Sequence, residues 1–353
     1  MSEVYTTIAA PNIALVKYWG KRDYSGLNLP YNSSVSMTLH QNIVRTVTSV
    51  ALGPEIKKDT IYVDGKPQDS TRGDEKVKLI LRVIREMKAM GNSEEGVLVV
   101  SRNNFPAGSG LASSASGGAA LVFALNEALS LHLDSRRLSV LARRVSGSAC
   151  RSIFGGFVRW NRGTSPGGED SYAEQIAPPS HWKLIDVIGI VSASSKKVSS
   201  SAGHLITPKT SVLYKSRLEL AERNAEGVAR AIKNRDFETL AEITMADSNN
   251  MHATMLDSWP PIKYMNDKSW KVVEATHEMN SRYGRNIAAY TFDAGPNAHV
   301  ITTPKYLKEV EGEIRDALGD GVRIFASHIG DGPRLTDKKD RLIDDSLQPI
   351  LAH

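Results

Sequence analysis

The chain has 353 residues, of which 41% are hydrophobic and 24% are charged. This composition is typical of a folded globular protein and excludes a disordered one, and the length suits two domains or one large domain. With 44 Lys and Arg against 39 Asp and Glu, the net charge of +5 suits anionic small molecules but is too small to indicate nucleic-acid binding. The single cysteine, Cys150, excludes an intramolecular disulfide and a multi-cysteine zinc cluster.

No apolar run reaches the roughly 18 residues that a membrane-spanning helix needs. The first residues lack a basic stretch followed by an apolar one, so we expect no secretory signal. A lone cysteine agrees with a reducing compartment. We therefore expect a cytoplasmic protein with a small-molecule substrate, no membrane contact and no nucleic-acid partner.

Strand and helix patterns alternate in the first half of the chain. The expected strands are 42–50, 60–63, 96–101 and 184–191, and the expected helices lie around 77–87, 121–129 and 138–145. Asp64-Gly65 is a hairpin-turn signal, Asp134 a helix N-cap and Gly91 a helix end. Residues 162–180 contain Gly, Pro and Ser and predict a long loop.

The second half follows a Ser/Lys-rich connector at 192–201, near which we place a domain boundary. The expected helices here are 212–250, 269–283 and 307–318, and the expected strands are 287–292, 299–303 and 322–326. This order predicts an α+β sandwich. We divide the chain into an N-terminal domain (1–190), a C-terminal domain (191–335) and a polar tail (336–353) that we expect to be frayed.

The most distinctive segment reads Pro106-Ala107-Gly108-Ser109-Gly110-Leu111-Ala112-Ser113-Ser114. It follows an expected strand and opens a helix, so its backbone N–H groups and the helix N-terminus form an anion site. The spacing excludes a Walker A loop, because no Lys follows Gly110, and a dinucleotide loop, because Ser113 stands at the third glycine position. The alternative is a flexible loop capped by serine.

A second cluster, Asn12-Ile13-Ala14-Leu15-Val16-Lys17-Tyr18-Trp19-Gly20-Lys21-Arg22-Asp23, places four charges beside Tyr and Trp next to an apolar strand. It is either the end of a strand that presents lysines to an anion, or simply a strand with a solvated basic end.

The third cluster is Ser146-Gly147-Ser148-Ala149-Cys150-Arg151, small residues at a helix junction that leave room for a ligand. Arg151 can bind a carboxylate or phosphate with two parallel N–H bonds, or it is an ordinary surface arginine. Cys150 has no evident partner base and is best explained as a buried filler.

Asp293 is the fourth candidate, at the end of an apolar strand and before Ala294-Gly295-Pro296. A carboxylate held rigidly at such a position suits a catalytic base. The alternative is a turn-forming aspartate.

Together, these segments resemble one superfamily, the GHMP small-molecule kinases, whose ATP-phosphate loop is similar to residues 106–115. Within that superfamily the chain resembles the mevalonate diphosphate decarboxylases, in order, from about residue 6 to 334. The further matching segments are Asn12-Ile13-Ala14, Asn32-Ser33-Ser34-Val35-Ser36, Gly155-Gly156-Phe157-Val158, Asp247-Ser248-Asn249 and Phe292-Asp293-Ala294-Gly295-Pro296.

The resemblance implies a two-domain GHMP kinase fold of the α+β class, with an N-terminal domain like domain 2 of ribosomal protein S5 and a ferredoxin-like C-terminal domain. It also implies a reaction of isoprenoid and sterol biosynthesis. ATP with Mg²⁺ phosphorylates the 3-hydroxyl of (R)-mevalonate 5-diphosphate; loss of phosphate and CO₂ then gives isopentenyl diphosphate. Family analogy favours a homodimer.

The resemblance assigns roles to individual residues. Asp293 matches the catalytic aspartate that orients or deprotonates the 3-hydroxyl, Lys17 the lysine beside it, and Arg151 the arginine that holds the substrate carboxylate. Residues 106–114 match the ATP site, and no residue is assigned to the metal. The substrate-contacting positions are Tyr18, Trp19, Gly20, Lys21, Lys76, Ser146, Gly147, Ser148, Ala149, Cys150, Ser200 and Ser201.

The sequence departs from the family pattern at several positions. Gly108-Ser109 stands where Ala-Ala is common, His204 where Met is usual, and Lys76 where an Arg often contacts the diphosphate. Two rival functions remain. One is a mevalonate or phosphomevalonate kinase that does not decarboxylate, and the other is a catalytically silent ATP- or RNA-binding module.

Overall fold

The computed structural model describes residues 3–23, 26–68, 74–105, 113–191 and 197–350. Its N-terminal part contains a six-stranded sheet in the order β14-β1-β4-β7-β5-β6. These strands are β1 (Val4–Ala9), β4 (Thr46–Gly53), β5 (Thr60–Val63), β6 (Lys66–Pro67), β7 (Gly96–Asn103) and β14 (Arg334–Leu335). The hairpin predicted at Asp64-Gly65 is confirmed, since Tyr62 pairs with Pro67 and Val63 with Lys66.

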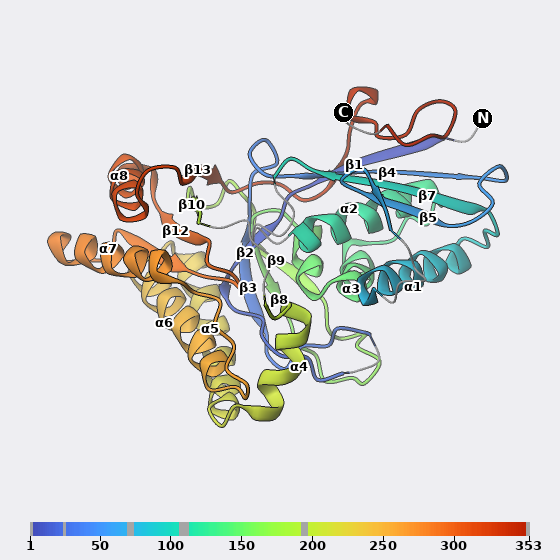
Figure 1. The fold of residues 1–353 in the computed structure, drawn as a ribbon. Coiled ribbons are helices and arrows are strands. Elements are labelled where there is room, and N and C mark those ends of the chain that lie inside the picture. Colours follow the sequence, from blue (N-terminus) through green and yellow to red (C-terminus); the bar gives the residue numbers. More distant parts are fainter. Residues whose placement is uncertain (1–2, 24–25, 69–73, 106–112, 192–196, 351–353) are drawn as a thin grey trace.

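Three helices cover one face of this sheet: α1 (Glu75–Met90), α2 (Ser113–Ala128) and α3 (Ser135–Val145) (Figure 1). Local signals predicted their ends correctly. Asp134 caps α3 by accepting a hydrogen bond from the Arg137 backbone N–H, and α1 ends at Gly91. The first turn of α2 follows the predicted anion-binding loop, but residues 106–112 of that loop lie outside the described residues.

A second sheet, in the order β2-β3-β8-β9, lies at the centre of the molecule. It contains β2 (Asn12–Val16), β3 (Ser34–Thr38), β8 (Phe157–Trp160) and β9 (Ala173–Ala177), and a 3₁₀ helix, η2 (Gly147–Ile153), precedes β8. The long loop predicted at 162–180 is therefore wrong in part, because β9 occupies its second half and pairs with β8.

The third sheet has the order β11-β12-β10-β13. Its strands are β10 (Ile185–Ile190), β11 (Ala288–Thr291), β12 (Ala298–Thr302) and β13 (Arg323–His328). The accompanying helices are α4 (Ser200–Thr210), α5 (Tyr214–Asn234), α6 (Phe237–Leu256), α7 (Asp267–Tyr283) and α8 (Leu307–Leu318), with the short η3 (Pro304–Tyr306) and η4 (Lys338–Asp340). The single helical pattern predicted over 212–250 is two helices, since Arg235 adopts a left-handed conformation (φ 55°) and Asp236 caps α6.

The central and third sheets share one hydrophobic core. Ile13 and Leu15 of β2 belong to the same buried cluster as Val187 of β10 and Leu240 of α6. The end of β2 is therefore held by the C-terminal half of the chain. The strand β10 pairs within the third sheet although the predicted boundary places it before residue 191. The division into domains stays a prediction.

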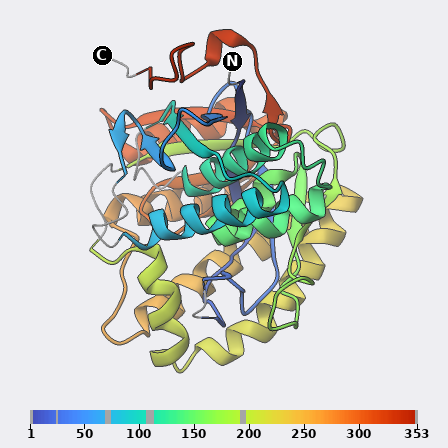
Figure 2. The same ribbon diagram turned by 90° about the vertical axis from the view of Figure 1, so that its right-hand side faces the viewer.

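The described part of the tail, residues 336–350, is packed against the protein, so the expectation of a frayed segment is wrong for these residues. Leu342 and Ile343 are buried beside Ala51 and Leu98, and the Leu342 backbone N–H donates to Ser49 Oγ at 2.9 Å. Figures 1 and 2 both place the tail on the outer side of the N-terminal sheet, opposite α1 and α2. Among the described residues, no helix has the length and apolarity to span a membrane.

Candidate active site

A cavity of about 700 Å³ lies where the three helices of the N-terminal part meet the end of β2, α4 and the β11–β12 connection. It brings together predicted site residues that are far apart in the sequence. Those that line it are Lys17, Tyr18, Trp19, Lys21, Lys76, Ser113, Ser114, Ser146, Gly147, Ser148, Arg151, Ser200, Ser201 and Asp293.

Three predicted substrate-contacting residues do not line this cavity. Ala149 and Cys150 are completely buried in η2, and the Cys150 Sγ donates to the Gly147 carbonyl at 3.0 Å. Burial raises the pKa of Cys150 to about 12, which agrees with the expected filler role. Gly20 is required by the backbone conformation, because its φ is +95°. A Cβ there would also lie 1.7 Å from Tyr214 Oη.

Lys17 and Asp293 form an ion pair in the cavity wall. Lys17 Nζ donates to Asp293 Oδ1 at 2.6 Å, and the Lys17 side chain is 1% exposed while that of Asp293 is 30% exposed. Lys17 follows β2 and Asp293 follows β11, so two sheets place the two charges. The solvated basic end considered for Lys17 is thereby excluded.

The charges around Asp293 keep its carboxylate ionised. Burial alone raises the pKa of Asp293, but Lys17, with His299 and Arg151, outweighs burial and lowers that pKa below its ordinary value. For Lys17, burial lowers the pKa, and the neighbouring Asp293 opposes that effect. Asp293 is therefore a weak base at neutral pH, better suited to orienting a hydroxyl than to removing its proton unaided.

Arg151 is 3% exposed, so it is not the ordinary surface arginine of the alternative interpretation. Its Nε donates to Asn12 Oδ1 at 3.1 Å and its Nη1 to Ser34 Oγ at 2.7 Å. Within the described residues, Nη2 has no hydrogen-bond partner and is available to a ligand. Arg151 is thus held rigidly by neutral groups and offers its charge to the cavity.

His204 of α4 fixes the segment that follows Lys17. Its Nδ1 accepts the Gly20 N–H at 2.8 Å, and its ring lies 4.3 Å from the Tyr18 ring and 4.4 Å from the Trp19 ring. Burial, with a smaller effect of Lys21, keeps the pKa of His204 well below its ordinary value. The sequence marked His204 as a departure from the family pattern but gave no sign that it stacks here.

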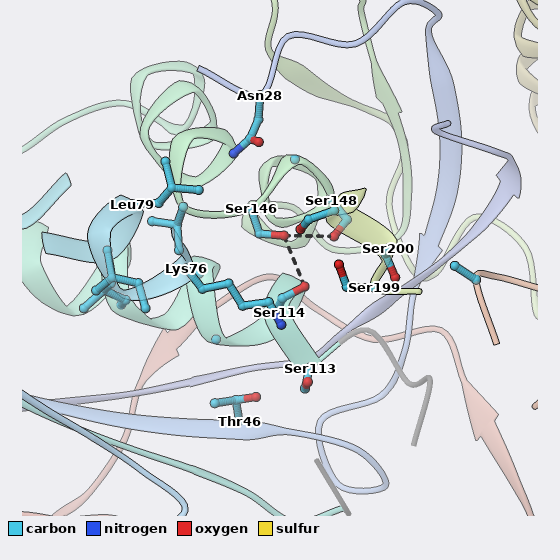
Figure 3. Close-up of a pocket in the computed structure, with 18 of the residues that line it drawn as sticks. Asn28, Thr46, Lys76, Leu79, Ser113, Ser114, Ser146, Ser148, Ser199 and Ser200 are labelled. Carbon is cyan, nitrogen blue, oxygen red and sulfur yellow. Dashed lines mark hydrogen bonds between the residues drawn. The ribbon is translucent and has the colours of Figure 1, made fainter. Parts of the chain in front are cut away.

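Serines from three segments converge on another part of the cavity (Figure 3). Ser146 Oγ donates to Ser114 Oγ at 3.1 Å and lies 3.5 Å from Ser148 Oγ, while Ser200 approaches from the start of α4. The Lys76 side chain points toward Ser113 and Ser114 in Figure 3. Hydroxyls, an ammonium group and the N-terminus of the 16-residue α2 together suit a phosphate chain.

The far end of the cavity is apolar, and the sequence did not predict it. It is lined by Ile61, Val63, Val77, Leu79, Ile80, Val99 and Leu121. Strand alternation in β5 and β7 and the apolar side chains of α1 and α2 turn these residues toward the cavity, where the sequence had indicated only strands and helices.

No group of three or more His, Cys, Asp or Glu side chains that could hold a metal occurs in the described part of the chain. The donors present near the start of α2 are serine hydroxyls, notably Ser113 and Ser114. Mg²⁺ accepts such oxygen ligands and usually keeps several waters while binding substrate phosphates. The donor set therefore fits a cation that is held mainly by the nucleotide.

An α+β chain with a serine-lined helix N-terminus facing a Lys–Asp pair defines a phosphoryl-transfer protein of the GHMP kinase class. Residues 9–173 match the family "Diphosphomevalonate decarboxylase-like N-terminal domain" and residues 186–323 match "Mevalonate 5-diphosphate decarboxylase C-terminal domain". The chain belongs to the diphosphomevalonate decarboxylase family.

Individual relatives agree. The diphosphomevalonate decarboxylase of Saccharomyces cerevisiae is 45% identical over 324 residues, which cover 88% of this chain and 80% of the relative. The diphosphomevalonate decarboxylase of Homo sapiens is 44% identical over 311 residues, which cover 84% of this chain and 76% of the relative. The complex of MDDEF with MVAPP, AMPPCP and magnesium has a TM-score of 0.84 at 36% identity and covers 96% of this chain and 100% of its own.

Proposed function

We propose that this cavity carries out the ATP-dependent decarboxylation of (R)-mevalonate 5-diphosphate, giving isopentenyl diphosphate, ADP, phosphate and CO₂. The observation that carries the proposal is the 2.6 Å contact of Lys17 Nζ with Asp293 Oδ1 in a cavity that also contains Arg151 and the start of α2. The reaction is a step of isoprenoid and sterol biosynthesis. Membership of the decarboxylase family supports it.

In the first half of the reaction, the 3-hydroxyl attacks the terminal phosphate of ATP. Asp293 accepts a hydrogen bond from that hydroxyl and aims its oxygen, while Lys17 keeps the carboxylate ionised and fixed. A tertiary alcohol is a poor acid, so alignment contributes more than basicity. Phosphoryl transfer needs little else besides alignment and charge neutralisation.

In the second half, the new phosphate leaves C3 and the carboxylate is lost as CO₂. Positive charge develops at C3, and the Asp293 carboxylate, held by Lys17, stabilises it. Arg151, with Nη2 directed to a ligand, holds the substrate carboxylate so that its C–C bond is aligned for cleavage. Tyr18 adds a donor, since its buried Oη has no partner within the described residues.

The nucleotide fits the remaining part of the cavity. Lys76 would hold its phosphates, and the Ser113 and Ser114 hydroxyls would hold the phosphates and the accompanying Mg²⁺, which neutralises phosphate charge when bound. The apolar end lined by Ile61, Leu79 and Val99 suits the adenine ring. Ser200 and Ser201, at the start of α4, face the same space and suit the substrate diphosphate.

The test is the stoichiometry of the purified protein with mevalonate 5-diphosphate, ATP and Mg²⁺. We expect one CO₂ and one ADP for each substrate molecule consumed. ADP without CO₂ would support the rival kinase function and contradict decarboxylation. Omission of Mg²⁺ is the control and should stop both products.

We also propose a homodimer in the cytoplasm. The homodimer rests on family resemblance, and the compartment rests on the single buried cysteine, which needs no oxidising environment. Light scattering should give twice the 38.5 kDa mass of one chain, and the monomer mass would contradict the dimer. Fractionation of the source cells tests the location.

A further inference from the structure

The helix α6 contacts the backbone on both sides of the Lys17–Asp293 pair. Asp247, in the interior of α6, accepts the Lys17 backbone N–H on Oδ2 at 2.7 Å. Arg217 of α5 donates from Nη2 to the Lys17 carbonyl at 3.2 Å and pairs with Asp247 at 3.3 Å. Both backbone polar groups of Lys17 thus bind one ion pair from the C-terminal half, and the Lys17 carbonyl also accepts a hydrogen bond from Asn32 Nδ2 at 2.9 Å.

The next residue of α6 holds the segment that carries Asp293. Ser248 Oγ accepts the Phe292 N–H at 3.0 Å, and His252 Nε2 lies 3.3 Å from the Phe292 carbonyl oxygen. Ser248 and His252 are four residues apart and lie on one face of the helix. The residue before Asp293 is therefore held on both of its backbone groups as well.

These contacts lie outside the cavity lining. Asp247 and Arg217 have side chains with 0% exposure, and neither lines the cavity. A buried ion pair is a poor source of stability because desolvation opposes the Coulombic attraction. Fixed geometry is a better explanation for this pair, since each partner also binds the Lys17 backbone. Asp247 does not cap the helix, because it lies eleven residues from the N-cap Asp236.

We propose that Asp247 and Ser248 are positioning residues that set the separation of the Lys17 ammonium and the Asp293 carboxylate. One helix acts as the common reference for two segments 276 residues apart in the sequence. The proposal rests on the proposed function, in which the two groups align the 3-hydroxyl. A shift of about 1 Å in such a site can lower the rate by about 100-fold.

The first test compares Ser248→Ala with Thr254→Val, a control on the same helix. Both variants remove a buried hydroxyl, but within the described residues that of Thr254 bonds only to the Met251 carbonyl of α6 itself. We expect Ser248→Ala to lower kcat by about 10-fold or more, with the Kd of both substrates, measured by calorimetry, changed less than about twofold. Thr254→Val should keep kcat while lowering Tm by a similar amount. Equal kcat per folded molecule in the two variants would make Ser248 a purely structural residue and overturn the proposal.

The second test is a crystal structure of Asp247→Asn, a variant that keeps an acceptor for Lys17 but loses the charge that faces Arg217. We expect the Lys17–Asp293 contact to lengthen and kcat to fall while ATP still binds. If Asp247→Asn does not fold, the Ser248→Ala structure serves for the same measurement. An unchanged Lys17–Asp293 contact in the variant examined overturns the proposal. The Lys17–Asp293 distance in the crystal structure tests the positioning role even if the wild-type protein shows no decarboxylation.

Discussion

A neutral histidine shapes the substrate side of the cavity as much as the charges do. Since His204 Nδ1 accepts the Gly20 N–H, the ring proton resides on Nε2, and the low pKa keeps the ring uncharged at neutral pH. The neutral ring of His204 therefore places no second positive charge beside Lys21. Burial lowers the pKa of Lys21 itself. His204 is an organiser of the Tyr18–Lys21 segment.

Replacing His204 tests that role. His204→Met keeps the size of the side chain but loses the acceptor for Gly20, so we expect KM for mevalonate 5-diphosphate to rise by about fivefold to tenfold. His204→Asn keeps an acceptor near Nδ1 and should have the smaller effect. KM for ATP should stay unchanged in both. Equal KM values for the substrate in wild type and His204→Met would show that the hydrogen bond is unimportant.

Arg151 should be irreplaceable for a different reason. Its guanidinium binds Asn12 and Ser34 and still has an N–H-bearing nitrogen for the substrate, a geometry that a lysine cannot reproduce. We expect Arg151→Ala and Arg151→Lys each to lower kcat/KM by about 100-fold or more, because a buried charge partner is lost. Circular dichroism and ATP binding control for folding. An unchanged kcat/KM would refute the carboxylate contact.

Elements that leave a clear local pattern were predictable, whether as caps and turns or as the apolar runs of β7, β10, β11, β12 and β13. The caps of α1 and α3 and the hairpin at Asp64-Gly65 involve residues near one another in the chain, and all were confirmed. The strand β9 was missed because its pairing with β8 lies across the 162–172 connection. Family resemblance identified Lys17, Arg151 and Asp293. The distances between them depend on how β2, η2 and β11 pack together, which the sequence does not give.

The packed tail makes a stability prediction at the scale of one element. Ile343 is completely buried beside Leu98 and Val100, on the face of the N-terminal sheet opposite the cavity. We expect Ile343→Ala to lower the free energy of unfolding by about 2–4 kcal/mol, measured by urea denaturation. The value of kcat should stay within a factor of two. An unchanged unfolding free energy would mean that the tail is not packed in solution.

For the molecule as a whole, buried histidines predict sensitivity to acid. Burial lowers the pKa of His252 to about 4, below its ordinary 6.5. Between these two values, the unfolded chain binds a proton that the folded chain does not, so the free energy of unfolding falls as the pH drops. His252 alone contributes a loss of about 3 kcal/mol across that window, and His204 adds to it in the same direction.

The variant His252→Gln should flatten that pH dependence. Glutamine keeps an N–H donor for the Phe292 carbonyl but does not titrate. The measurement is urea denaturation at several pH values between 4 and 7, with the wild type as reference. A slope as steep as that of the wild type would show that His252 is not the group responsible.

The two halves of the chain meet at the Lys17–Asp293 pair, so the proposed reaction depends on one arrangement of the whole molecule. The end of β2 shares its core with the third sheet, and α6 binds the segments before and around both charged groups. The apolar end of the cavity comes from the N-terminal part, whereas its serines come from both the N-terminal part and the start of α4. In the proposed function, substrate and nucleotide meet beside Asp293.

The most direct measurement is the turnover of Asp293→Asn together with its binding of both ligands. Asparagine has the same shape but cannot supply the charge that aims the hydroxyl and stabilises the developing cation. We expect kcat to fall by about 10³-fold to 10⁴-fold, while calorimetry gives Kd values for mevalonate 5-diphosphate and ATP within a few fold of the wild type. A folded Asp293→Asn variant with kcat within about threefold of the wild type would contradict the account.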